Sequence, residues 1–384
     1  MKFSIDNGVL KKCKVENGET EAIIPDGVTV IGDHAFDGAA DIANFLSDIK
    51  NVAKMAAMKE KAKSEDGGNI DNMLENIKNS CGGCTGLKSI TIPASVRKIG
   101  NSAFCECSKL ESIVIPDGVT TIDDHAFESC SSLNSLTIPD SVKKMGGFVF
   151  RGCYNLETVK LPKNIKSIGY GAFDYCPNLK SVEIPGSVLS IGESAFESCA
   201  SLTTIVVPDG VTTIGLNAFL DCENLTNITI PNSATIIENA FDGTKWLQEY
   251  PDDFVVINGI LVRYKGEEKD IVIPDTATVI GCEAFVECNS LKSVTIPSSV
   301  KRIEDISFLG CKNLESVTIL DSVTSIGKMA FSSCTNLKSI TIPDSVTKIE
   351  KEAFEECKDL VINASKNSCA IKYAKQHKIP FKII

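Results

Sequence analysis

The repeating unit of this chain begins with a short alternation of apolar and polar residues. In one copy, residues 87–93 read LKSITIP, with isoleucine at every second position. Side chains next to each other along a strand point to opposite faces. The alternation therefore predicts a half-buried strand with Ile90 and Ile92 facing inward and Ser89 and Thr91 facing outward. Proline ends the strand because it has no amide proton to continue the ladder.

The second half of the unit carries a shorter apolar pair and a turn. Val96 and Ile99 lie three residues apart, and Gly100 gives the backbone the freedom to turn. Ala103 and Phe104 then predict a helical turn on the opposite side of the coil. Phenylalanine recurs at this position in nearly every copy. We therefore expect the rings to stack as an internal aromatic ladder.

The unit repeats with a period of 23 residues, and one cysteine per copy marks the step. A fixed period of about 20 to 29 residues with aliphatic residues at set positions predicts a leucine-rich-repeat solenoid. The expected fold class is an α/β repeat solenoid, a right-handed coil with capping β-hairpins and a helical insertion. Each ladder thiol is expected to be buried and to face the thiol of the next coil. The ladder cysteines are Cys84, Cys107, Cys130, Cys153, Cys176, Cys199, Cys222, Cys288, Cys311, Cys334 and Cys357.

This repeat resembles the BspA-like subfamily of leucine-rich repeats. The signature C-x-x-L-x-x-I-x-I-P-x-x-V-x-x-I-G-x-x-A-F recurs over most of the chain. Departures are local: Leu320 replaces the proline, Met145 replaces an isoleucine, and the unit ending at Phe241 is one residue short. The resemblance implies a binding protein, and many members of the subfamily look like adhesins.

We expect residues 1–384 to form a single solenoid that is capped and interrupted. Two regions, 3–36 and 254–285, carry Asn-Gly between two apolar runs, which predicts a β-hairpin in each. The first hairpin would cover the open end of the coil, where unpaired strand groups invite aggregation. The expected segments are a cap hairpin and first repeat (1–36), a helical hairpin insertion (37–83), a first repeat run (84–243), a hairpin insertion (244–273), a second repeat run (274–359) and a C-terminal cap (360–384). Trp246 is expected to pack at the junction before the second hairpin.

The insertion at 37–83 has its own apolar pattern. Apolar residues recur there mostly at spacings of three and four, which predicts an amphipathic helix followed by a shorter one. Two interpretations stay open: the apolar face packs on the solenoid, or it contacts a partner or a second copy. The candidate partner helix carries Ile42, Phe45, Ile49 and Val52.

Charge and hydropathy narrow the classes of partner. The net charge is −11, whereas nucleic-acid binders usually carry a basic stripe that neutralises phosphates. We therefore expect no nucleic-acid partner. No run approaches the roughly 18 apolar residues of a membrane span, so membrane insertion is not expected. Residues 1–13 lack the apolar core of a secretory signal. Either the chain is not exported by that route, or a leader has been removed.

The sequence offers little for catalysis, metal binding or a cofactor. His34 and His125 occupy the same slot before Ala-Phe and are expected at the surface. Cys81 and Cys84 form a C-x-x-C, but a zinc site usually needs a second such pair. A disulfide between Cys81 and Cys105 is an alternative. We expect no enzyme activity, no metal and no cofactor.

A ligand is expected on the outer face of the strand series, which is the concave face in leucine-rich repeats. Its outward residues are mostly Thr and Val, which also simply favour strands. Lys160 and Glu183 depart from this pattern, either as a surface salt bridge or as a polar binding patch. The candidate binding residues are Thr91, Val114, Thr137, Lys160, Glu183, Val206, Thr229, Thr295, Thr318 and Thr341.

Two functions follow from these expectations. The first is a non-catalytic adhesion module that binds a protein or glycan at a cell surface, as the resemblance implies. The second is an intracellular interaction scaffold, because a ladder of thiols suits a reducing compartment.

Overall fold

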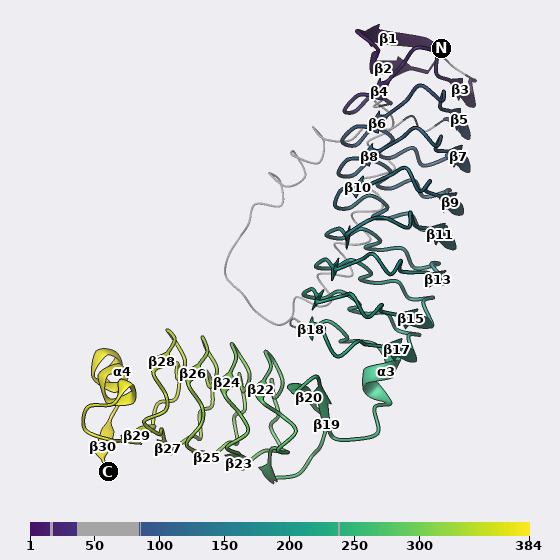
Figure 1. Ribbon diagram of the computed structural model, residues 1–384. Helices are drawn as coiled ribbons and strands as arrows, with labels where there is room; N and C mark the ends of the chain where they lie inside the picture. Colours follow the sequence, from purple (N-terminus) through teal and green to yellow (C-terminus); the bar gives the residue numbers. More distant parts are fainter. Residues whose placement is uncertain (16–17, 37–83, 85, 237–238) are drawn as a thin grey trace. The chain divides into compact units, whose positions relative to one another are not determined.

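The computed structural model describes residues 1–15, 18–36, 84, 86–236 and 239–384. Each coil contains a longer strand, a two-residue strand and a turn, and consecutive coils stack with their strands parallel. The predicted helical hairpin at 37–83 lies outside the described residues. Figure 1 shows the longer strands along one side of each stack and the two-residue strands along the other.

The longer strands lie where the Ser-Ile-Thr alternation predicts them. Their central residues are buried: Ile90, Ile113 and Val159 face the core while their neighbours on the strand face outward. The register is constant, and Ser89 lies opposite Ser112 as Ile90 lies opposite Ile113. The longer strands are β3 (Glu21–Ile23), β5 (Ser89–Thr91), β7 (Ser112–Val114), β9 (Ser135–Thr137), β11 (Thr158–Lys160), β13 (Ser181–Val182), β15 (Thr204–Val206), β17 (Asn227–Thr229), β21 (Asp270–Val272), β23 (Ser293–Ile296), β25 (Ser316–Ile319) and β27 (Ser339–Thr341).

A second strand in each coil was not predicted. The Ile of each Ile-Gly pair, expected only as part of a short apolar pair, ends a two-residue strand that pairs with its counterpart in the next coil. Most of these strands place a single buried side chain, as Ile99 does in β6, whereas Met145 and Ile349 are half-buried. A strand of two residues is too short to show an alternation. They are β4 (Val30–Ile31), β6 (Lys98–Ile99), β8 (Thr121–Ile122), β10 (Lys144–Met145), β12 (Ser167–Ile168), β14 (Ser190–Ile191), β16 (Thr213–Ile214), β18 (Thr235–Ile236), β22 (Val279–Ile280), β24 (Arg302–Ile303), β26 (Ser325–Ile326) and β28 (Lys348–Ile349).

The helical turn predicted at Ala103 and Phe104 is wrong. Ser102 and Glu106 adopt left-handed backbone angles, with φ of 50° and 57°, on either side of this pair. The amides of Ser102, Phe104 and Glu106 donate to carbonyl oxygens of the next coil rather than to their own. The segment is thus a chain of turns bonded from coil to coil. An apolar pair with polar flanks does not distinguish this arrangement from one turn of helix.

Gly100 is required by close packing rather than by its own backbone angles. A Cβ at this position would lie 2.5 Å from the Asp33 carboxylate and 2.9 Å from the Asp33 amide nitrogen of the preceding coil. No real Cβ tolerates such an approach, so a side chain here would push the coils apart. Glycine is therefore required at this position, as expected, but because of the close approach of the coils and not because of its freedom to turn.

The predicted aromatic ladder is confirmed. Fully buried phenylalanines stack from coil to coil, with ring centroids 4.5 to 5.7 Å apart. Tyrosines extend the second run of rings at both ends, Tyr264 against Phe285 and Tyr373 against Phe354. A buried aromatic side chain contributes a large apolar area to a core, so the ladder is a main source of cohesion between coils.

Ten of the eleven ladder thiols are buried as predicted, whereas Cys288 is half-buried, and eight of them contact a backbone group. The Sγ of Cys130 donates to the carbonyl oxygen of Phe104 in the preceding coil at 3.1 Å. Seven further ladder cysteines repeat this bond at 3.0 to 3.2 Å. The thiol is therefore small enough for the core and supplies a weak donor to a buried carbonyl.

Both predicted hairpins are present. β1 (Lys2–Asp6) pairs with β2 (Val9–Lys14), and β19 (Phe254–Ile257) pairs with β20 (Ile260–Tyr264), each antiparallel. The Asn-Gly pairs have positive φ at both residues, as this tight hairpin turn requires. β2 continues into the two-residue series through β4, and β20 does so through β22.

The C-terminal cap has the predicted strand and helix. Strand β29 (Val361–Ala364) pairs with β27, and helix α4 (Cys369–His377) begins at Ser368, whose hydroxyl accepts from the amide of Ile371. The final apolar residues form a further strand, β30 (Phe381–Ile383), beside β29. No described helix is long and apolar enough to cross a membrane.

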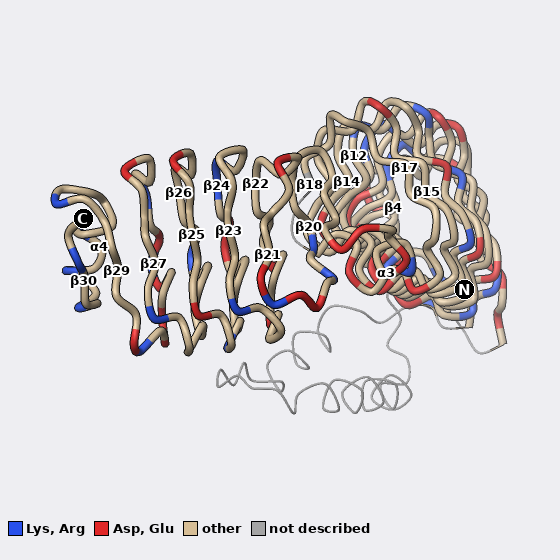
Figure 2. The backbone as a smooth tube through the Cα atoms, turned by 90° about the horizontal axis from the view of Figure 1, so that it is seen from below, with Lys and Arg blue, Asp and Glu red and all other residues tan. Residues whose placement is uncertain are grey.

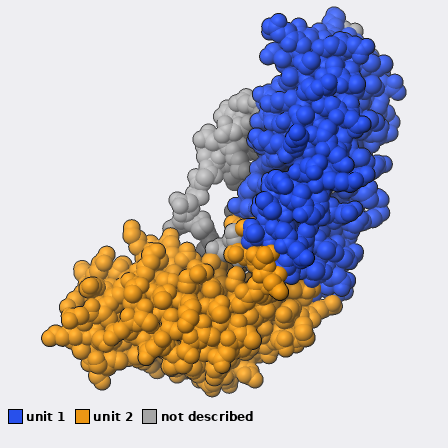
Figure 3. Space-filling model, in the orientation of Figure 1, with its two compact units in different colours: residues 1–212, 218–231, 243–245 blue, residues 213–217, 232–242, 246–384 orange. Residues whose placement is uncertain are grey.

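The chain divides into two compact units, which Figure 3 colours separately. Unit 1 comprises residues 1–212, 218–231 and 243–245, and unit 2 comprises residues 213–217, 232–242 and 246–384. The Trp246 ring contacts Phe241 and Tyr250, with centroids 5.1 and 5.4 Å away. Trp246 lies within the short helix α3 (Lys245–Gln248), and the contact lies just before the second hairpin, as expected.

Candidate binding surface

The outward residues of the longer strands form one exposed row in each unit. Val114 is 77% exposed and Val206 58%, although both are aliphatic. Thr295 is the exception among the candidates because it is half-buried. The other exposed candidates are Thr91, Thr137, Lys160, Glu183, Thr229, Thr318 and Thr341.

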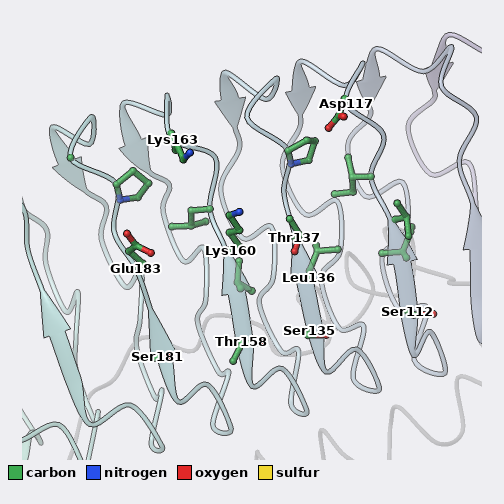
Figure 4. Close-up of a pocket in the computed structure, with 18 residues that line it drawn as sticks. Ser112, Asp117, Ser135, Leu136, Thr137, Thr158, Lys160, Lys163, Ser181 and Glu183 are labelled. Carbon is green, nitrogen blue, oxygen red and sulfur yellow. The ribbon is translucent and has the colours of Figure 1, made fainter.

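Four of the candidates meet in one groove of unit 1. The groove has a volume of about 780 Å³ and crosses β7, β9, β11 and β13. Val114, Thr137, Lys160 and Glu183 line it, and the turns after the strands add Asp117 and Lys163. Figure 4 shows Thr137, Lys160 and Glu183 on the same face of neighbouring coils. The other candidates lie on the longer strands outside this groove.

Lys160 and Glu183 do not pair with each other in the described structure. Instead, Lys180 Nζ lies 2.7 Å from Glu157 Oε2, and Lys163 Nζ lies 3.7 Å from Asp140 Oδ2. The backbone amide of Lys163 also donates to Asp140, which lowers the pKa of that carboxyl. The proposed Lys160–Glu183 salt bridge is therefore wrong, and both charges remain on the groove surface.

A model of the BspA type leucine rich repeat region, in six copies, matches residues 4–134, 75–203, 120–248 and 263–374. These matches cover most of the chain. The chain belongs to the BspA-type leucine-rich repeat family. The resemblance inferred from the repeat signature is thereby confirmed.

Solved structures similar to this BspA-type chain include two bacterial leucine-rich repeat proteins. A leucine-rich cell surface protein of Faecalibacterium prausnitzii is 27% identical, covering 94% of this chain and 86% of its own, with a TM-score of 0.49. A leucine-rich repeat protein of Bacteroides ovatus is 23% identical, covering 100% and 97%, with a TM-score of 0.44. A search of curated proteins found no match.

Two ladder thiols of this BspA-type chain, Cys107 and Cys153, are poorly suited to redox or metal chemistry. Burial raises the pKa of Cys107 and of Cys153 to about 12, so few thiolates are present at neutral pH. Cys84 of the C-x-x-C and Cys105, the candidate disulfide partner, are also buried, and Cys81 lies outside the described residues. Among described residues, no group of three His, Cys, Asp or Glu could hold a metal ion.

The two histidines expected at the surface are half-buried. His34 and His125 both adopt left-handed angles in the turn before Ala-Phe. His125 Nδ1 lies 2.6 Å from Glu128 Oε2, and its ring stacks on Phe148 at a centroid distance of 5.0 Å. Both lie at the surface but are only partly exposed, because the side chain of the next coil covers this slot, as Phe148 covers His125.

Sequence reasoning missed a group of aromatic and charged residues on these turns. Arg151 lies between Glu128 and Asp174, with its Nε 3.0 Å from Asp174 Oδ2. All three directly follow the ladder phenylalanine of their coils. Reading this slot coil by coil, as was done for the longer strands, would have placed the three side chains in one row.

Proposed function

We propose that this chain is a non-catalytic binding module whose groove across β7, β9, β11 and β13 contacts a protein or glycan, with adhesion at a cell surface as its role. The observation that supports the proposal most directly is the groove itself. It combines the exposed aliphatic side chain of Val114 with the charges of Lys160 and Glu183, which do not form a salt bridge with each other. Apolar contact area and a few polar groups are what a binding site needs to hold and orient a ligand.

The family supports a binding role over a catalytic one. Solenoids carry function on extended surfaces that successive repeats present in register. The parallel pairing of β9, β11 and β13 sets the groove side chains at fixed spacing, so a ligand can bridge several coils. Figure 2 shows acidic and basic residues interspersed along both units, which suits a mixed polar surface rather than a phosphate-binding stripe.

A charge swap tests the groove without changing the net charge. The probe is an array of immobilised extracellular proteins and glycans, incubated with the labelled full chain. We expect the double variant Lys160→Glu and Glu183→Lys to weaken binding to an arrayed ligand at least about tenfold, because buried interface charges of the wrong sign cost several kcal/mol.

The matched control is Lys292→Glu with Glu315→Lys, an exposed ion pair in unit 2. This control should leave binding within about twofold, as expected for a surface pair worth little. Equal losses in both variants, or no binding by the unmodified chain to any arrayed class, would contradict the groove as the binding site.

An intracellular interaction scaffold is the second candidate. Every described cysteine is a thiol rather than a disulfide, which suits a reducing compartment. Surface biotinylation of the cell that makes the protein separates the two roles. Labelling from outside supports adhesion, and protection in the soluble fraction supports the scaffold.

A further inference from the structure

A second surface of unit 1 gathers aromatic and charged side chains on three consecutive turns. These residues lie at the turn side of the coil, away from the longer strands. We refer to them as the turn cluster: His125, Glu128, Phe148, Arg151, Tyr170, Asp174 and Tyr175.

Phe148 is the centre of the turn cluster. Its ring stacks on His125, meets the Tyr170 ring edge-on at a centroid distance of 4.5 Å, and lies 5.2 Å from the Arg151 guanidinium carbon. Phe148 has a φ of 54°, which costs a bulky residue roughly 1 to 2 kcal/mol. The equivalent residues Ser102 and His125 of the two preceding coils have the same left-handed φ, so this angle belongs to the repeat, and only the bulk of the side chain distinguishes Phe148.

The neighbouring coil is fitted to this ring. A Cβ on Gly171 would lie 2.4 Å from two carbons of the Phe148 ring. Only glycine leaves room there, so the ring and the glycine are complementary features of adjacent turns. The aromatic row is therefore held in place rather than loosely exposed.

Asp174 supplies a carboxylate that the described residues leave incompletely satisfied. Its side chain is only 8% exposed, and one oxygen receives the Arg151 Nε at 3.0 Å. The other oxygen, Oδ1, is buried and has no hydrogen-bond partner among the described residues. The pKa of Asp174 is raised to about 7, mainly by burial; Arg151 lowers it, and the charges of Glu197 and Glu128 contribute to the rise. One guanidinium thus does not offset the negative charge gathered here.

Acidic residues outnumber basic ones on the surrounding turns. Residues 123–128 contribute three carboxylates, of which Asp123 pairs with Lys98 at 2.6 Å, and residues 193–197 contribute two more. The turn between Gly146 and Cys153 contributes Arg151. Glu128, Glu193 and Glu197 are half-buried. Carboxylates in such partly desolvated positions attract a cation more strongly than exposed ones.

The exposed side chains of the turn cluster are of the kinds that dominate protein interfaces. Tyr170 is 45% exposed and Tyr175 44%. Tyrosine and arginine are enriched among residues that contribute most to binding, and aromatic rings attract cations over their faces. The longer-strand groove has no aromatic residue in its lining.

We propose that the turn cluster is a second interaction surface, which binds an arginine-containing segment of a protein partner. The guanidinium of the partner lies on the exposed rings of Tyr170 and Tyr175 and is held by the negative charge of Asp174, Glu128 and Glu197. This surface is separate from the groove, so either can fail without the other.

The test uses a fluorescent peptide with three arginines spaced by glycines and the full chain. A peptide of the same length with citrulline in place of arginine is the neutral probe. We expect the chain to bind the arginine peptide and not the citrulline peptide in fluorescence anisotropy. The double variant Tyr170→Ser and Tyr175→Ser should weaken binding at least about tenfold at unchanged net charge, because the ring faces are lost.

Two control variants are placed on equivalent turns of unit 2. The first is Met329→Ser, because Met329 has the same position in its repeat as Phe148. The second is Glu287→Gln, because Glu287 has the same position as Tyr175, and this variant removes one carboxylate. Both should bind the peptide within about twofold of the unmodified chain. Equal losses in the controls, or full binding by the tyrosine variant, would overturn the proposal and leave only non-specific attraction to an acidic protein.

The pH dependence gives a second readout. A bound cation favours the charged form of Asp174, so binding below about pH 7 must first displace a proton from it. Affinity should therefore rise between pH 6 and pH 8, and Asp174→Asn should abolish that rise. Arg151, Glu128, Glu197 and Tyr175 also face this carboxyl. A rise that persists in Asp174→Asn would assign the titration elsewhere and count against the proposal.

Discussion

At the scale of the residue, the ladder cysteine has two tasks in one small side chain. It fills the space between coils, and its thiol donates to the carbonyl of the preceding ladder phenylalanine, as Cys153 does to Phe127 at 3.2 Å. Serine could donate the same bond but would be more costly to bury. A thiol is therefore well suited to a position that is apolar on most sides and faces one buried acceptor.

Thiol reactivity among the described cysteines should follow burial rather than ladder position, because the off-ladder Cys13 and Cys105 are buried as well. Since thiolate is the reactive form and burial raises the pKa of Cys107 and Cys153 to about 12, these residues should react very slowly at pH 8. The half-buried Cys282 and Cys369 should be labelled first. Iodoacetamide labelling followed by peptide mapping measures the order.

The control for this experiment is labelling in guanidinium chloride, where all sixteen cysteines should react alike. A Cys153→Ser variant should leave the fast-reacting sites unchanged in the folded protein. Rapid labelling of Cys153 in the native chain would show that the ladder is open to solvent and contradict the burial described above.

At the scale of the element, hairpins and turns follow from sequence to different degrees. Asn258 and Gly259 predict the β19–β20 hairpin because both central residues of its turn need positive φ, which Asn and Gly adopt readily. The turns around Ala-Phe give no such signal. Their left-handed residues include Ser102, Glu106 and His125, which are ordinary residues that only the bonds from coil to coil hold in that conformation.

Gly259→Ala should destabilise unit 2. The residue has a φ of +78°, and its new Cβ would lie 2.8 Å from Thr278 Oγ1. We expect a loss of about 1 to 3 kcal/mol in the free energy of unfolding, measured by urea titration. Gly186→Ala is the matched control because nothing lies within 4 Å of its Cβ and its φ is not positive. A similar loss of stability in both variants would show that the positive φ of Gly259 is not the cause of the destabilisation.

At the scale of the whole molecule, cohesion comes from contacts between neighbouring coils. Each ladder ring touches the ring before and after it, as Phe308 touches Phe285 and Phe331 at 4.5 and 4.9 Å. Stability in such a chain is approximately a sum of repeat and nearest-neighbour contributions. Damage to one coil should therefore be felt locally.

Phe308→Ala should reveal this locality. Deleting a fully buried ring typically costs about 3 to 5 kcal/mol, and hydrogen exchange should rise most in residues 285–354. Protection should change less in coils farther along the stack. The exposed Thr318→Ala serves as control and should leave exchange unaltered. Uniform loss of protection along the whole chain would contradict nearest-neighbour cohesion.

The repeat, its strands and its ladders could be read from the sequence because each is a local pattern that recurs. The pattern predicts that Ile90 and Phe104 are buried in one copy. The equivalent residues of every further copy support the same prediction. The same holds for the exposed row that contains Val114, since alternation along a strand settles which side chains face outward. Residues 37–83 have a helical pattern of their own, which lies outside the described residues and stays a prediction.

Only the tertiary structure decided which side chains of neighbouring coils contact one another. Residues 23 positions apart in the sequence become neighbours, and a period alone does not say which pairs of charges meet. Lys180 forms a salt bridge with Glu157, whereas Lys160 and Glu183 do not form one with each other. The turn cluster likewise joins Phe148 to Gly171 and Arg151 to Asp174 through packing across coils. Local alternation specifies burial, but contact across coils depends on side-chain direction and on the close approach of turns, which exist only once the chain has coiled.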